Sequence, residues 1–163
     1  MLHSLELEFI HFIQKFKNPV FDEFFGLLDL LDSPMCFFMM ISIIWLIGGS
    51  KIGVRLFYLL LFNSLINCGL EKVFLFISRP IDLDPNIAFW YLADEYRFPS
   101  IAAQSAILLS GLLVKNINKN RWKWFAFSYI FLVSFSRVYL GFYFPSDILA
   151  GWLVALIIWV LYI

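Results

Sequence analysis

Charged residues and cysteines are scarce in this chain, and each scarcity excludes a class of protein. Charged residues make up 15% of the 163 residues, against about 25% in soluble domains. The cysteines, Cys36 and Cys68, lie in apolar runs, which argues against a disulfide framework or a cysteine-based zinc site. The net charge is +0, which leaves no basic surface for a nucleic acid. We therefore predict no nucleic-acid partner.

Apolar side chains are what the chain has in excess. Hydrophobic residues make up 62% of it and aromatic residues 20%, with 20 phenylalanines, and the mean hydropathy is +0.84. A water-soluble domain of this length has too little interior to bury so many apolar side chains. The N-terminus has no basic segment, so we expect no cleaved signal peptide. The sequence predicts a single-domain, all-α integral membrane protein.

Five apolar stretches predict about five transmembrane spans, because a helix that crosses a bilayer needs roughly 20 largely apolar residues. The stretches are Pro34–Ile47, Val54–Ser78, Ile101–Val114, Trp122–Phe135 and Ile148–Ile163. Several are short for a full crossing, and tryptophans and tyrosines near their ends are expected to extend them into the headgroup region. We therefore expect residues 34–163 to form a transmembrane helical bundle.

Residues 1–33 follow a different pattern. Charged side chains interrupt this segment, and Asn18-Pro19 divides it in two. The apolar residues of its first half recur at intervals of three and four: Phe9, Phe12, Ile13 and Phe16. This spacing predicts a pair of amphipathic helices at the membrane interface. The two histidines of the chain, His3 and His11, lie on this segment, and we interpret both as interface residues.

Basic residues in the short loops predict the orientation, because such loops stay on the cytoplasmic side. They gather in two loops, as Lys51, Arg55, Lys115, Lys119, Arg121 and Lys123. The loop from Arg79 to Pro99 and the turn from Arg137 to Ser146 are then expected on the non-cytoplasmic side. The small size fits a bacterial inner (cytoplasmic) membrane, by analogy.

Charged side chains at the edges of spans are candidates for function, because ionised groups are costly there. Lys72 and Arg79 are seven residues apart, so a continuous helix would place both on one face. Ser100 is expected to cap the third span, whose free backbone N–H groups attract anions. Arg137 ends the fourth span and Asp147 opens the fifth. Three cations and one carboxylate together predict a phosphate or diphosphate site. A single cation at the end of a span often only extends its charged group to the membrane interface and binds no ligand.

Three segments resemble, in order and spacing, the motifs of the type 2 phosphatidic acid phosphatase superfamily: K-x6-R-P, P-S-G-H and S-R-x5-H-x3-D. The first is complete from Lys72 to Pro80, the second begins at Pro99, and the third runs from Ser136 to Asp147. The resemblance implies a helical bundle that dephosphorylates phosphatidic acid, phosphatidylglycerophosphate or undecaprenyl diphosphate, without a metal or other cofactor. It also implies phosphate binding at Lys72, Arg79, Ser100, Ile101 and Arg137, with Asp147 orienting the nucleophile.

Both histidines that this family uses for catalysis are replaced. The nucleophile position holds Tyr143, the acid position holds Ala102, and the glycine before the acid is Ile101. A phenol with a pKa of about 10 is a poor substitute for an imidazole that titrates at about 6.5. Alanine donates no proton, and the loss of a positioned acid typically lowers a rate by about 10²–10⁴-fold. We therefore expect a site that holds phosphate and hydrolyses its ester poorly, if at all.

Three functions remain open at this point. The favoured one is a protein that keeps the cage for a lipid phosphate or polyprenyl (di)phosphate and has lost most or all phosphatase activity. The second is an active phosphatase that uses Tyr143, or a water activated by Asp147. The third is a structural or interaction subunit with a membrane protein partner, packing through small residues such as Ala106 and Ser110. The first is favoured because a structural relic gains nothing from costly cations at the edges of spans.

Overall fold

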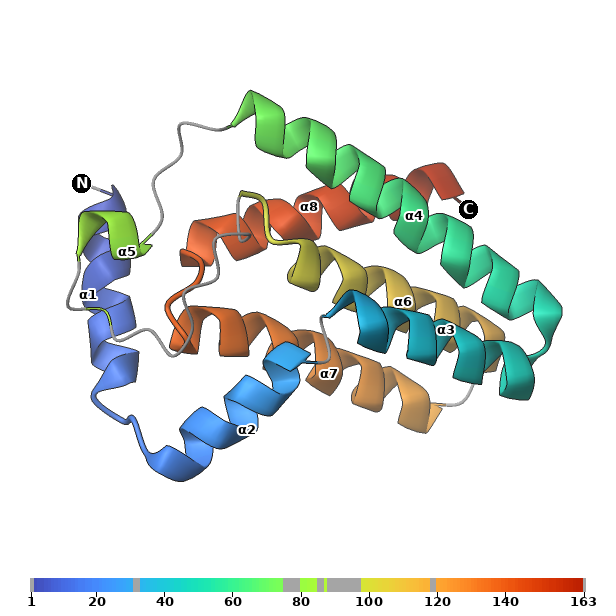
Figure 1. Cartoon of the computed structure of the whole chain (residues 1–163), viewed down its shortest axis with the longest axis horizontal. Coiled ribbons are helices and arrows are strands. Elements are labelled where there is room, and N and C mark those ends of the chain that lie inside the picture. The colour runs from blue at the N-terminus through green and yellow to red at the C-terminus, as the bar shows by residue number, and fades with distance from the viewer. Residues whose placement is uncertain are drawn as a thin grey trace.

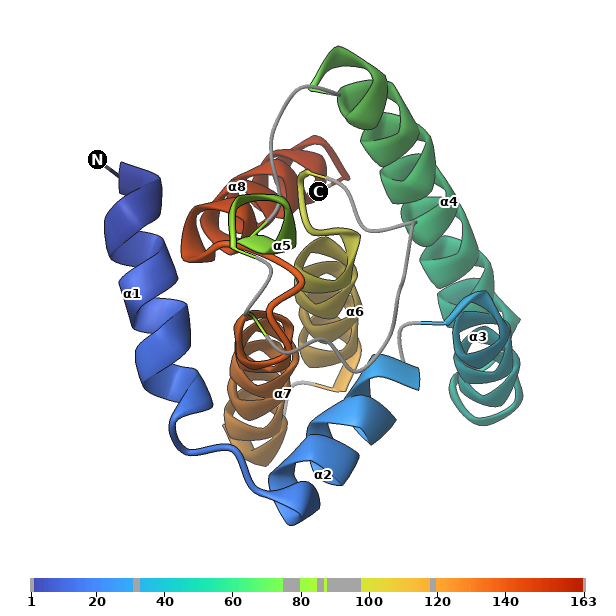
Figure 2. The same cartoon turned by 60° about the vertical axis from the view of Figure 1, so that its left-hand side comes forward.

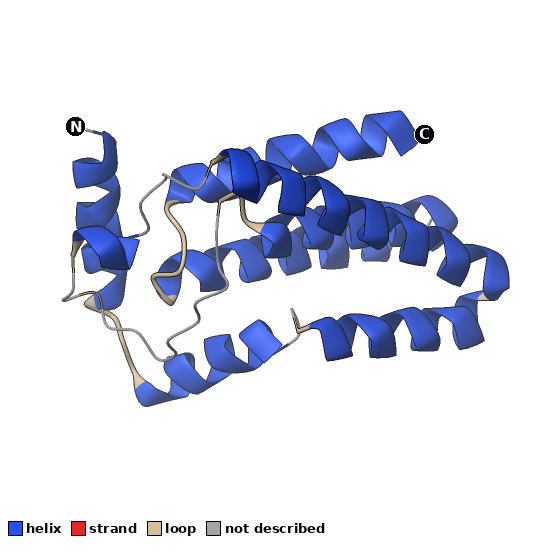
Figure 3. Ribbon diagram, turned by 45° about the horizontal axis from the view of Figure 1, so that its top comes forward, coloured by secondary structure: helices blue, strands red, loops and turns tan. Residues whose placement is uncertain are grey.

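The computed structural model describes residues 2–30, 33–74, 80–84, 87, 98–117 and 120–162. The described chain is helical and contains no strand (Figure 3). The helices are α1 (Leu2–Gln14), α2 (Pro19–Leu30), α3 (Pro34–Gly48), α4 (Ser50–Val73), α5 (Pro80–Leu83), α6 (Ile101–Ile117), α7 (Asn120–Tyr139) and α8 (Pro145–Tyr162). This confirms the all-α fold predicted from the sequence.

A bundle of five helices corresponds to the five predicted apolar stretches, of which residues 75–78 and 163 lie outside the described residues. Helix α6 contacts α4, α7 and α8, and α3 packs on α4 (Figure 1). By length and composition, α4 and α8 are able to cross a membrane, whereas the apolar parts of α3 and α6 are shorter. The five predicted spans are thus two long helices and three shorter or less apolar ones.

The outer surface of the bundle is strongly apolar. Large hydrophobic side chains are exposed along α8, including Leu153, Val160 and Leu161, and along α7, including Phe127 and Phe131. Soluble monomers rarely expose continuous apolar patches of this kind. These faces are suited to lipid, as expected for a membrane protein.

The N-terminal segment forms two helices that meet at the predicted break. Pro19 occupies the first position of α2, where its missing N–H is no loss, and Asn18 Oδ1 accepts a hydrogen bond from the Val20 N–H. Both helices pack against α7 (Figure 2). Ile10 and Phe25 join a buried cluster with residues of the turn between α7 and α8. The helix pair therefore covers part of the bundle at the end where that turn lies.

One predicted boundary is wrong. The second predicted span runs to Ser78, but α4 ends at Val73, and the Phe74 N–H donates a helical hydrogen bond to Leu70 O. The apolar run continues past this point, so composition alone did not mark the helix end. Lys72 lies exposed in the last turn of α4. Arg79 lies outside the described residues, so its predicted stacking with Lys72 stays a prediction.

Candidate functional site

The predicted phosphate site requires four helix ends to meet on one side of the bundle. The C-termini of α4 and α7 and the N-termini of α6 and α8 do lie at the same end (Figures 1 and 3). Helices α1 and α5 lie at this end too (Figure 1). Lys72, Ser100, Arg137 and Asp147 are therefore carried to a common region by the helices that hold them.

Ser100 caps α6, as the sequence predicted. Its Oγ accepts a hydrogen bond of 3.4 Å from the Ala103 N–H, its carbonyl accepts the Gln104 N–H, and the residue is fully buried. Helix α8 approaches this cap closely, because a Cβ on Gly151 would lie 2.8 Å from Ser100 O. Glycine at this position thus allows α8 to lie directly against the cap of α6.

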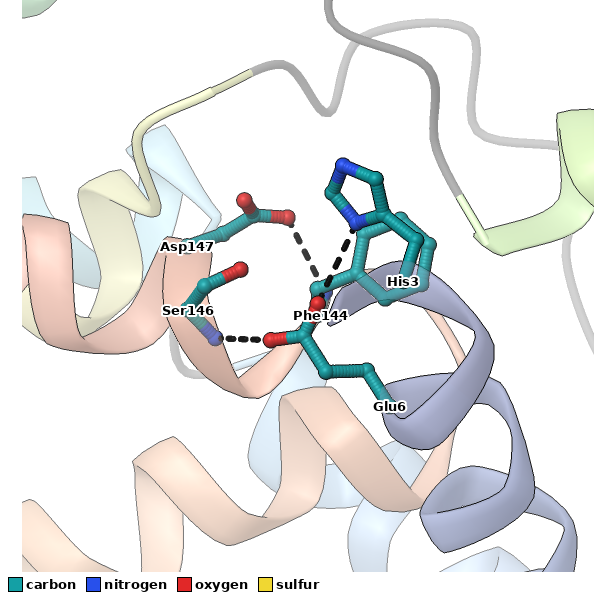
Figure 4. Close-up of polar contacts among 5 residues, drawn as sticks. All are labelled: His3, Glu6, Phe144, Ser146 and Asp147. Atoms are coloured by element: carbon teal, nitrogen blue, oxygen red, sulfur yellow. Dashed lines mark hydrogen bonds and ion pairs between the residues drawn. The ribbon is translucent and has the colours of Figure 1, made fainter. Parts of the chain in front are cut away.

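Asp147 caps its own helix. It is buried, and its Oδ2 accepts a hydrogen bond of 2.9 Å from the Phe144 N–H at the start of α8 (Figure 4). The next free N–H of this helix end, that of Ser146, donates a 2.9 Å hydrogen bond to Glu6 Oε1 of α1 (Figure 4). Carboxylates suit a helix N-terminus, where the helix dipole is positive. The N-terminus of α8 therefore already holds two carboxylates of the protein, whereas the helix end that the sequence predicted to face phosphate is that of α6.

The two histidines lie at this end of the bundle, which sequence reasoning missed. His3 Nδ1 is 3.2 Å from Glu6 Oε2, and the His3 ring packs on Phe144 with 4.8 Å between ring centroids (Figure 4). His11 Nε2 is 2.8 Å from Asp84 Oδ2. The interpretation of both as interface residues stays a prediction, and each is held by a carboxylate of the protein. The His3–Glu6 pair has the three-residue spacing of a local helical contact, whereas no local pattern predicts the pairing of His11 with Asp84.

Arg137 is the most deeply buried cation of the described site. The residue is fully buried, its Nη1 donates to Asp29 Oδ1 of α2, and its guanidinium lies 5.9 Å from the centre of the Phe142 ring. The sequence placed Arg137 at the site but did not predict Asp29 as its partner. The predicted excess of three cations over one carboxylate is therefore too simple, because Asp29 and Glu6 add two negative charges.

The two positions at which the sequence resemblance places the family's histidines are packed inside the protein. Ala102 is buried against α7 in a small cluster with Ala106 and Val133. Tyr143 is buried in the cluster that joins the α7–α8 turn to α1 and α2. Ile101 is half-buried at the start of α6. Ala102 therefore serves close helix packing, and the Tyr143 ring contributes to an apolar core.

A buried row of polar side chains runs between α4 and α6, and the sequence analysis did not single it out. The Gln104 amide donates to Asn67 Oδ1 at 2.9 Å, the Asn67 amide donates to Glu71 Oε1 at 3.1 Å, and the Asn63 amide donates to Ser105 Oγ at 3.4 Å. The spacing of Asn63, Asn67 and Glu71 by four residues places them on one face of α4. Polar residues inside a span are a signal that could have identified this row.

Metal chemistry has no support among the residues that the structure describes. They contain no group of three or more His, Cys, Asp or Glu side chains that could hold a metal ion.

The turn that carries the third motif depends on Gly141. Its φ is +77°, a conformation that L side chains rarely adopt, and an added Cβ would lie 2.6 Å from Ile87 Cγ2. We expect Gly141→Ala to lower the free energy of unfolding by about 1–2 kcal/mol from backbone strain alone. Thermal unfolding followed by tryptophan fluorescence in detergent tests this. Gly26→Ala, whose added Cβ meets nothing within 4 Å, is the control and should be neutral or stabilising.

Comparison with known proteins matches the chain to one family. Residues 52–163 match the family model described as the PAP2 superfamily. The crystal structure of Aquifex aeolicus LpxE superposes with a TM-score of 0.83 and 25% identity, covering 97% of this chain and 94% of that one. The crystal structure of a transmembrane PAP2-type phosphatidylglycerolphosphate phosphatase from Bacillus subtilis superposes with a TM-score of 0.81 and 21% identity, covering 99% of this chain and 84% of that one. No curated protein matches the chain. Because the matched segment is more than half of the chain, the protein belongs to the PAP2 superfamily.

Proposed function

We propose that this membrane protein binds a lipid phosphate or polyprenyl (di)phosphate and has lost most or all of the phosphatase activity of its family. The observation that carries the proposal is the arrangement of the third motif. Arg137 and Asp147 remain in place at the end of the bundle, while Tyr143 is part of an apolar core. The third motif thus has the family's residues at Arg137 and Asp147, but it has tyrosine at the position of the nucleophile.

The first test measures binding and turnover on the same preparations. Purified protein is given phosphatidic acid, phosphatidylglycerophosphate and undecaprenyl diphosphate, and both phosphate release and ligand affinity are recorded. The proposal requires binding with little or no release. Release that disappears in Asp147→Ala would contradict the loss of activity. Neither release nor binding would leave only the role of a structural or interaction subunit.

Arg137 provides the sharpest binding prediction. Replacing it with glutamine removes the positive charge, so we expect affinity for short-chain phosphatidic acid to fall by about 10–100-fold, as for other charge-assisted hydrogen bonds. Arg121→Gln is the matched control, because Arg121 lies exposed at the opposite end of the same helix. Equal losses in the two variants, measured by calorimetric titration, would indicate a general charge effect and not a site at Arg137.

A second candidate function is a phosphatase with a relocated imidazole. It is favoured by one observation, that Glu6 holds one ring nitrogen of His3 beside the N-terminus of α8 while the other ring nitrogen points away from Glu6 (Figure 4). A carboxylate-held imidazole is the usual arrangement for a base or nucleophile. If the protein releases phosphate, His3→Asn should abolish release and His11→Asn should not. Equal activity in both variants would exclude this candidate.

The membrane arrangement is part of the proposal. We place the protein in a bacterial inner membrane as one domain, residues 1–33 at the interface and 34–163 in the bundle, with the site on the non-cytoplasmic side. Support comes from the basic residues at the opposite end of the bundle, near the α3–α4 turn, the end of α6 and the start of α7: Lys51, Arg55, Lys115, Arg121 and Lys123.

A further inference from the structure

Two carboxylates from the N-terminal helices occupy two anion-binding groups of the site. Glu6 of α1 accepts the Ser146 N–H at the start of α8, and Asp29 of α2 pairs with Arg137 of α7. The groups that they occupy belong to the third motif, whereas the carboxylates lie outside residues 52–163, which match the family. A carboxylate and a phosphate make the same kinds of contact with a guanidinium and with a helix N-terminus.

We propose that Glu6 and Asp29 act as an internal anion, which a lipid phosphate must displace in order to bind. This inference rests on the proposed function, because it describes which groups of the protein occupy the proposed phosphate site when no ligand is bound. The decisive observation is burial: Arg137 is 0% exposed while Asp29 holds it. In this arrangement the guanidinium is closed to an incoming phosphate oxygen, and Asp29 holds its Nη1.

Both carboxylates are partly accessible to water. The side chain of Asp29 is 21% exposed and that of Glu6 is 13% exposed, so water reaches both carboxylates but not the guanidinium. A second carboxylate of α2, Asp22, accepts the Tyr139 hydroxyl at 2.8 Å and anchors the helix without touching a cation of the site. The helix pair can thus stay attached while the two competing carboxylates move.

An orienting role for Asp29 makes the opposite prediction. A carboxylate that only positions Arg137 for phosphate would improve binding, so removing its charge would weaken affinity. A carboxylate that competes for Arg137 weakens binding, so removing its charge would strengthen affinity. The sign of the change therefore decides between the two roles.

The test compares neutral variants with charge-matched controls. Asp29→Asn and Glu6→Gln each remove one negative charge at the site. Glu23→Gln and Glu8→Gln remove the same charge from exposed positions on the same two helices. Dioctanoyl phosphatidic acid is the probe, dioctanoyl phosphatidylcholine is the comparison, and pyrophosphate distinguishes headgroup binding from binding of the acyl chains. We expect affinity for phosphatidic acid to rise about tenfold in each site variant and less than twofold in the controls.

A second measurement follows the carboxylate itself. The chain has two histidines, so protein labelled with ¹⁵N-histidine gives signals from two imidazoles. His3 is bonded to Glu6 and His11 to Asp84, at opposite ends of α1. Adding dioctanoyl phosphatidic acid should shift the His3 signals more than those of His11. This readout remains informative if Asp29→Asn folds poorly, because it uses the unmodified chain.

The outcomes separate this inference from the proposed function. If the unmodified protein binds phosphatidic acid, but Glu6→Gln and Asp29→Asn bind it equally or more weakly, the internal anion is overturned and the phosphate site stands. Ligand binding that leaves the His3 signals unchanged overturns it too. If no folded variant binds phosphatidic acid or pyrophosphate, both are overturned. Tighter binding in both site variants, with no gain in the controls, supports the inference.

Discussion

Replacing Asp29 with alanine is expected to lower the free energy of unfolding by about 3–5 kcal/mol, the usual effect of removing one partner of a buried ion pair. The variant takes away the carboxylate that accepts from Arg137 Nη1, and that arginine is fully buried. A buried guanidinium deprived of this partner is far less stable than one exposed to water. Unfolding in detergent, followed by tryptophan fluorescence, measures the change.

The double variant Asp29→Ala, Arg137→Met distinguishes charge from packing. Apolar replacement of a whole buried pair is often neutral or stabilising, so the double variant should recover most of the lost stability. Glu23→Ala, an exposed carboxylate on α2, is the control and should change stability by less than about 0.5 kcal/mol. If the double variant is no more stable than Asp29→Ala, the loss comes from the packing of α2 on α7.

The second large effect is expected at Gly151, where α8 touches the cap of α6. A leucine there would place its Cβ 2.8 Å from the backbone oxygen of Ser100, so the two helices must separate. Overpacking of this kind typically costs about 1–3 kcal/mol. We expect this loss of stability together with at least tenfold weaker binding of phosphatidic acid, because Asp147 and Ser100 would no longer hold their relative positions.

Gly69 offers a matched control for Gly151. It lies exposed on α4, and an added Cβ meets nothing within 4 Å. Gly69→Leu should be neutral or slightly stabilising, because glycine is a poor residue inside a helix. Both variants add the same side chain to a helix of the bundle. Equal effects at the two positions would show that the contact between α6 and α8 does not limit stability or binding.

The sequence predicted the helices of the bundle well because apolar composition directly reports contact with lipid. Each predicted stretch corresponds to one helix, and the break at Asn18-Pro19 separates α1 from α2. The end of α4 was misplaced because residues 74–78 include four apolar side chains that read like a continuation of the span. Hydropathy indicates whether a segment is apolar enough to lie in lipid, but it does not indicate the residue at which the helix ends.

The site was predicted in part, for a related reason. Motif spacing brought Ser100, Arg137 and Asp147 to one end of the bundle, because each lies at a helix end. The pairing of Asp29 with Arg137 joins residues 108 positions apart, and that of Glu6 with Ser146 joins residues 140 apart. Such pairs follow from how α1 and α2 dock on α7 and α8, which periodicity does not report.

The polar row between α4 and α6 has a consequence for how the protein is assembled in the membrane. Asn63, Asn67 and Gln104 are fully or almost fully buried in the folded bundle. On a lone helix in lipid, the amides of Asn63 and Gln104 would face hydrocarbon without the partners that they have in the bundle, which opposes stable insertion. When α4 and α6 lie together, the Gln104 amide donates to Asn67 Oδ1 and the Asn63 amide donates to Ser105 Oγ. Helix α4 is therefore expected to remain at the insertion machinery until α6 has been synthesised, so that the two enter the bilayer as a pair.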